Sequence, residues 1–195
     1  MKFTLALATT CALLSVPAFA QSTTAPHTNC ATLTGATIST PEFVKKAILS
    51  NMLDDQGARL AERKGDSTEQ NFARQVVLDH TKATNALKTM VNTGKVNGQV
   101  PSALDCEHQQ KLTELQNLWG QSFDDAYSRN LLQSDQNQIS LFEHYAQNGD
   151  NAALRQWATK MLPEMKSHLV YAQLLGAEVN PGPAREEWQY DAAAV

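Results

Sequence analysis

The sequence has few charged residues and no excess of basic ones. Of its 195 residues 18% are charged, and 16 Lys and Arg against 20 Asp and Glu leave a formal net charge of −4. Proteins that bind nucleic acid through its phosphates need a basic surface, so we expect no nucleic acid partner. Nine glycines and seven prolines are too few for a collagen-like or mostly disordered chain. The 42% of hydrophobic residues is enough for the core of one domain.

Sequence motifs of several enzyme classes are also missing. There is no Gly-x-Ser-x-Gly elbow, no glycine-rich phosphate loop, no His-Glu-x-x-His helix and no Cys-x-x-Cys pair. Hydrolase, nucleotide-binding and thioredoxin-like functions therefore lose their usual support. These absences make an enzyme less expected than a binding or interaction protein.

Residues 1–20 have the pattern of a secretory signal peptide. Lys2 precedes an apolar run over 4–16, and Ala18-Phe19-Ala20 supplies a small-residue cleavage site. The run is shorter than the ~20 residues that cross a bilayer, and no long apolar run follows it. We expect cleavage after Ala20, a periplasmic protein and no transmembrane segment after cleavage, with peripheral outer-membrane association left open. A lipoprotein attached through Cys11 is the less favoured alternative.

Two cysteines, Cys30 and Cys106, remain after such cleavage. In an oxidising compartment they could form a disulfide that closes a long loop and ties the N-terminal segment to the domain. The alternative is two unpaired thiols. Spacing alone does not decide between the two.

The rest of the chain is divided by its apolar periodicity. Residues 21–38 are rich in Thr, Ala and Ser and predict a flexible lead-in, while 177–195 predict a loosely ordered tail. Between them, 39–176 predict an all-α, antiparallel four-helix bundle, because apolar residues recur every three or four positions and no segment alternates as a strand does. Four long helices and one extra helix in the connection between the second and third are expected: 40–64, 67–93, 123–147, 151–175 and, as the extra one, 103–118.

Polar residues at the helix starts predict the caps. Ser39 with Glu42, and Ser67 with Gln70, have the spacing of a capping box. The residues expected to cap the four long helices are Ser39, Ser67, Ser122 and Asp150.

One ionisable residue interrupts the apolar stripe of each long helix. Asp54 lies seven residues after Ala47, and His80 lies four after Val76. The same pattern places Asp135 and His168 on the inner faces of the third and fourth helices, with Glu164 one turn before His168. The methionines are expected to be core packing.

Imidazoles and carboxylates on facing helices can hold a metal ion inside a bundle. The candidate ligands are Asp54, His80, Asp135, His168 and Glu164, and nitrogen and oxygen donors would suit iron, manganese or zinc. A buried carboxylate beside a histidine is also a stable pair without any metal. Both interpretations stay open at this point.

Five short stretches together resemble a known family: Phe43-Val-Lys-Lys-Ala47, Ser50-Asn-Met-Leu-Asp54, Leu78-Asp-His80-Thr-Lys82, Phe123-Asp-x-x-Tyr127 and Leu162-Pro163 leading to His168-Leu169. The chain resembles, over about 41–175, the bacterial domain-of-unknown-function family 4142, whose members are described as outer-membrane or periplasmic proteins with a ferritin-like four-helix bundle. The resemblance implies a secreted envelope protein of unknown biochemical activity.

The chain departs from that family's pattern at its candidate ligands. Asp54 stands where the family commonly has Glu, and Asp135 where it commonly has His. Ferritin-like di-iron sites use Glu three residues before His, whereas Val77 and Met165 precede the two histidines here. A di-iron enzyme is therefore disfavoured.

Two functions follow as hypotheses. The first is a non-enzymatic envelope-stress or interaction module that binds an envelope protein or a second copy of itself. The second is a metal-binding protein with a site in the bundle interior.

Overall fold

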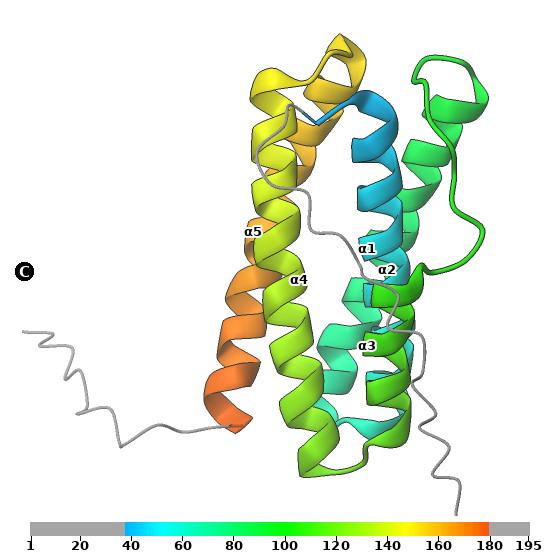
Figure 1. Cartoon of the computed structure of the whole chain (residues 1–195). Helices are drawn as coiled ribbons and strands as arrows, with labels where there is room; N and C mark the ends of the chain where they lie inside the picture. Colours follow the sequence, from blue (N-terminus) through cyan, green and yellow to red (C-terminus); the bar gives the residue numbers. More distant parts are fainter. Residues whose placement is uncertain (1–37, 180–195) are drawn as a thin grey trace, which may run out of the picture.

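The computed structural model describes residues 38–179, which form five helices and contain no strand (Figure 1). The all-α prediction is confirmed. The helices are α1 (Thr40–Lys64), α2 (Ser67–Asn92), α3 (Cys106–Asn117), α4 (Gln121–Asn148) and α5 (Ala152–Val179). The expected signal peptide, nearly all of the lead-in and residues 180–195 lie outside the described part of the chain.

Four long helices form an antiparallel bundle made of two hairpins. α1 packs most extensively on α2, and α4 packs on α5 (Figure 1). The hairpins meet where α1 contacts α4 and, less extensively, where α2 contacts α5. The short α3 lies in the connection between α2 and α4, as expected, and packs against α1 and α4. α5 continues past Gly176, which the sequence suggested as its end, to Val179.

The apolar core consists of two clusters. One, toward the α1–α2 turn, contains Leu53, Phe72, Leu115, Phe123 and Leu175. The other, toward the α4–α5 turn, contains Phe43, Ile48, Leu87, Phe142 and Tyr145. Between the clusters, at mid-length of the four long helices, lie eight buried polar residues that we call the polar layer: Asn51, Asp54, Asp79, His80, Thr84, Asp135, Gln138 and His168.

The end of the bundle near the α4–α5 turn is held by Tyr145. Its ring is fully buried and stacks on Phe43 with 4.1 Å between centroids. Its hydroxyl hydrogen-bonds with Thr40 and with Asp150, whose carboxylate also accepts from Thr40. Asp150 therefore ties α1 to this turn rather than capping α5. Asn151 is the cap instead, since its Oδ1 accepts from the backbone N–H of Leu154 at 2.9 Å.

Of the other predicted caps, Ser39 is at the expected position, whereas Ser67 and Ser122 are not N-cap residues. Ser39 occupies the N-cap position of α1 but makes no side-chain capping bond. α2 is capped by Asp66, not Ser67, because the Asp66 carboxylate accepts from the N–H groups of Thr68 and Glu69 at 2.8 and 2.9 Å. α4 begins before Ser122, and Gly120 precedes it with a φ of 53°, a conformation that glycine adopts easily.

The contrast between two caps gives a stability prediction. Asp66→Ala removes a carboxylate that satisfies two backbone donors, so it should lower the free energy of unfolding by about 1 kcal/mol. Ser39→Ala is the matched control, because the Ser39 side chain makes no capping bond. It should change the free energy of unfolding by less than ~0.5 kcal/mol. Urea denaturation followed by circular dichroism measures both. Equal losses in the two variants would contradict the assignment of Asp66 as the cap.

Candidate functional site

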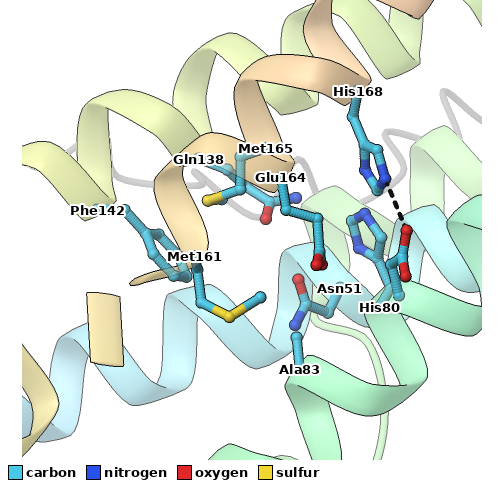
Figure 2. A pocket seen from close by; sticks show the side chains of 10 residues that line it. Asn51, His80, Ala83, Gln138, Phe142, Met161, Glu164, Met165 and His168 are labelled. Carbon is cyan, nitrogen blue, oxygen red and sulfur yellow. Dashed lines mark hydrogen bonds and ion pairs between the residues drawn. The ribbon is translucent and has the colours of Figure 1, made fainter. Parts of the chain in front are cut away.

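The polar layer borders a small cavity between the helices that is partly open to solvent (Figure 2). The volume of the cavity that is open to the centre of a water molecule is about 20 Å³. That is room for one water molecule or one ion. Figure 2 shows Met161, Glu164 and His168 reaching from α5 toward His80 and Ala83 of α2. The lining residues, from α1, α2, α4 and α5, are Asn51, Asp79, His80, Ala83, Gln138, Phe142, Met161, Glu164, Met165 and His168.

Two imidazoles lie side by side at the cavity. The rings of His80 and His168 stack with their centroids 5.4 Å apart and their planes within 12° of parallel. His168 Nε2 lies 3.1 Å from Asp79 Oδ2, and Gln75 donates to the same oxygen at 2.7 Å. Because a carboxylate only accepts, His168 carries a hydrogen on Nε2, and Nδ1 is the ring nitrogen left for another partner.

His80 is buried without such a partner. It is 7% exposed, and its Nδ1 has no hydrogen-bond partner among the described residues. The nearest carboxylate oxygen, Asp54 Oδ2, lies 3.7 Å from Nδ1, which is too far for a hydrogen bond. Burial, with a smaller effect from His168, lowers the pKa of His80 to about 3. The ring is therefore neutral at pH 7 and keeps a lone pair that can bind an electrophile.

Two buried carboxyl groups of the polar layer, those of Asp54 and Asp135, do not line the cavity. Asp54 accepts from Ser134 at 2.9 Å and from Gln138, and burial outweighs these bonds and raises its pKa to about 7. Asp135 is 2% exposed and its Oδ2 has no partner in the described part of the chain. Burial and the charge of Asp54 raise its pKa to about 8. The pair therefore holds protons near neutral pH.

The five residues singled out in the sequence are thus separated into two groups. His80, His168 and the half-buried Glu164 line the cavity, whereas Asp54 and Asp135 do not. Nowhere in residues 38–179 do three His, Cys, Asp or Glu side chains come close enough to hold a metal ion. Asp54 is occupied by Ser134 and Gln138, and His168 by Asp79, so the expected ring of nitrogen and oxygen ligands does not form.

Sequence reasoning singled out only His80, Glu164 and His168 among the ten lining residues, and it missed the others, including Asp79, Met161 and Met165. Asp79 lies seven residues after Phe72 and three after Val76, so its position on the apolar stripe was a usable signal. Met161 and Met165 were expected only to fill the core, and the structure places both in the lining as well. Nothing in the sequence separates a packed thioether from one at a cavity.

Other expectations concern residues away from the cavity. Cys106 is exposed at the first position of α3, and Cys30 lies outside the described residues, so their disulfide stays a prediction. None of the helices within residues 38–179 has the length and apolar character needed to span a membrane.

The family model described as "Domain of unknown function (DUF4142)" matches residues 22–175, most of the chain. The chain belongs to this family. The stretches by which the sequence resembled DUF4142 include Asp54, Asp79, His80 and His168, which the structure places together in the polar layer.

Among solved structures, this DUF4142 chain is similar to that of CopM in the Cu(II)-bound form. The TM-score is 0.59 and the sequence identity 13%, and the match covers 72% of this chain and 97% of that one. A similarity at this identity is one of fold. None of the curated protein sequences matches the chain.

Proposed function

We propose that this DUF4142 chain is a periplasmic, non-enzymatic protein that binds one transition-metal ion in the cavity of its bundle. The proposal depends on one observation: the buried imidazoles of His80 and His168 lie beside each other at a cavity of single-ion size. Because Nδ1 of His80 lies toward Asp54, Nε2 is the nitrogen of His80 that would bind an ion in the cavity. The signal-peptide pattern of residues 1–20 supports an extracytoplasmic location.

The lining suits some metal ions better than others. His80 and His168 offer imidazole nitrogens, and Asp79 orients His168 in the way that carboxylates orient metal-binding histidines. Iron and manganese sites in ferritin-like bundles need several carboxylates around one centre. Because Asp54 and Asp135 lie off the cavity, a di-iron or ferroxidase function is not supported. The fold shared with CopM, a structure that holds Cu(II), favours copper.

Metal titration of the mature protein tests the proposal. Calorimetry and elemental analysis should show about one equivalent of copper or zinc bound to a chain that begins at Gln21. His80→Ala should weaken binding by about 100-fold, since it removes a ligand that the bundle holds in place. His144→Ala is the matched control, because His144 is an exposed histidine of α4 away from the cavity, and should bind as the wild type does. Absence of metal binding, or equal binding by His80→Ala, would refute the proposal.

The envelope-stress or interaction role expected from the sequence stays a prediction. The exposed large apolar side chains that could contact a protein partner or a second copy are Leu78, Trp119, Val170, Tyr171 and Leu174. A metal-binding bundle with these side chains on its surface is compatible with both hypotheses.

A further inference from the structure

We propose that the outer face of α2 and α5 docks on the surface of a membrane that contains anionic lipid. This inference goes beyond metal binding, and it uses only the extracytoplasmic location proposed above. Among the large apolar side chains that are exposed in the described part of the chain, all but Trp119 lie on these two helices. They are Leu78 of α2 and Val170, Tyr171 and Leu174 of α5. Exposed apolar side chains that lie together mark interaction sites, whereas single ones are normal.

The apolar side chains of the two helices lie next to each other. Leu174 follows Val170 by four residues and Tyr171 by three, so the three are neighbours on the surface of α5. The Tyr171 ring reaches α2, where it stacks on Phe72 with 5.0 Å between ring centroids. Leu78 is exposed on the same helix, six residues after Phe72.

The exposed charges around these side chains are positive. Arg74, Leu78 and Lys82 follow one another at intervals of four residues and are all exposed, so they form one stripe along α2. Lys160 is exposed about three helical turns before Tyr171, on the same side of α5. We call these residues the α2–α5 face: Arg74, Leu78, Lys82, Lys160, Val170, Tyr171 and Leu174.

The acidic residues of the two helices do not offset these cations. Glu69 and Asp79, the two acidic residues of α2, are buried, and Glu164 of α5 is half-buried at the cavity. Glu143 of α4 pairs at 2.8 Å with Lys166, which is not part of the face. The chain as a whole has a formal net charge of −4, so the positive charge is not a property of its whole surface. The face therefore complements a negatively charged partner.

An anionic lipid surface matches both the charge and the apolar side chains. Lys and Arg are attracted to anionic headgroups, while their apolar stems lie along the hydrocarbon boundary. Tyrosine is enriched at the membrane–water interface, and aliphatic side chains enter below the headgroups. The other apolar residues of the face are Leu and Val, which are under-represented among the residues that dominate protein–protein binding. Two copies of the face would bring like charges together.

Co-sedimentation with vesicles tests the proposal. The chain that begins at Gln21 is mixed, in the presence of a metal chelator, with vesicles of equal parts phosphatidylglycerol and phosphatidylcholine or of phosphatidylcholine alone. We expect binding to the first vesicles at low salt, its loss as salt is added, and no binding to the second. The double variants Lys82→Gln/Lys160→Gln and Leu78→Ser/Leu174→Ser should each bind at least about tenfold more weakly.

Two controls match these variants. Lys45→Gln/Arg63→Gln removes two exposed cations of α1 and changes the net charge by the same amount. Trp119→Ser removes an exposed apolar side chain outside the face. Both controls should bind vesicles as the wild type does, and circular dichroism should show the helix content of the wild type in all four variants.

The other outcomes would overturn the proposal. Equal vesicle binding by the face variants and their controls, or no binding to the phosphatidylglycerol vesicles, would exclude a lipid surface. Binding of polyglutamate but not of vesicles, through Lys82 and Lys160, would assign the face to an acidic protein. A dimer that does not bind vesicles and that Leu78→Ser/Leu174→Ser dissociates would assign it to a second copy. Because the chelator removes metal ions, the metal-binding proposal and this one can fail independently.

Discussion

Asp135→Asn should stabilise the bundle by about 2 kcal/mol at pH 8, and hardly at all at pH 4. Asp135 is 2% exposed, and its pKa is raised to about 8 by burial and by Asp54. In the unfolded chain the same carboxyl titrates near pH 4. Between these two values folding has to take up a proton, so the wild-type carboxyl lowers stability progressively as pH rises toward 8.

The size of the effect is set by two opposing contributions. A pKa difference of about four units corresponds to ~5 kcal/mol above pH 8. An asparagine amide does not titrate, so it removes the dependence of stability on pH. The amide is buried where Asp135 Oδ2 finds no hydrogen-bond partner, and an unsatisfied buried polar group costs about 1 to 3 kcal/mol. Below pH 4 the carboxyl is neutral in both states, and the gain disappears.

Urea denaturation from pH 4 to 9 measures this prediction. The difference between Asp135→Asn and wild type should grow with pH and level off above pH 8. Glu114→Gln is the matched control, since Glu114 is exposed on α3 and its replacement should change stability by less than ~0.5 kcal/mol throughout. A difference that does not depend on pH would show that Asp135 is charged in the native state at pH 7.

Phe43→Ala should cost about 4 kcal/mol, the largest loss that we expect from a single apolar truncation. Phe43 is fully buried, stacks on Tyr145, and packs at a tilt against Phe142 with 4.9 Å between ring centroids. Its removal leaves a cavity at the end of the bundle where Tyr145 joins Thr40 to Asp150. That network resists collapse of the surrounding helices into the space.

The comparison again uses urea denaturation. Phe43→Leu, which keeps most of the volume, should lose less than half as much as Phe43→Ala. Leu78→Ala serves as the control, because this leucine is 62% exposed on α2 and should change stability by less than ~0.5 kcal/mol. A loss below ~1 kcal/mol in Phe43→Ala would contradict the role assigned to this end of the bundle.

Periodicity predicted the helices well because burial repeats with the turn of the helix. The burial of Asp54, His80, Asp135 and His168 follows from it, whereas the end of α1 at Lys64 follows from the glycine after it, Gly65. The caps were predicted less well. Asp66 and Ser67 are both good capping residues, and which one caps depends on where the backbone leaves the helical conformation.

Side-chain partners could not be predicted from a single-helix pattern. Asp79 and His80 are neighbours in sequence, yet successive residues of a helix point about 100° apart. His80 therefore faces Asp54 of α1, while Asp79 faces His168 of α5. The sequence shows that a residue points inward, but its partner depends on how the helices are rotated against one another. The same rotation places the side chains of Met161 and Met165 at the cavity.

The division of the core has a consequence for motion. We expect each apolar cluster to open as a unit of its own, because the polar layer separates the two clusters. Among the neighbouring pairs of long helices, α2 and α5 pack on each other least extensively. We therefore expect local opening at mid-length of the bundle as well as fraying at its ends. A small ion could enter between α2 and α5 during such local opening, while both ends of the bundle stay folded.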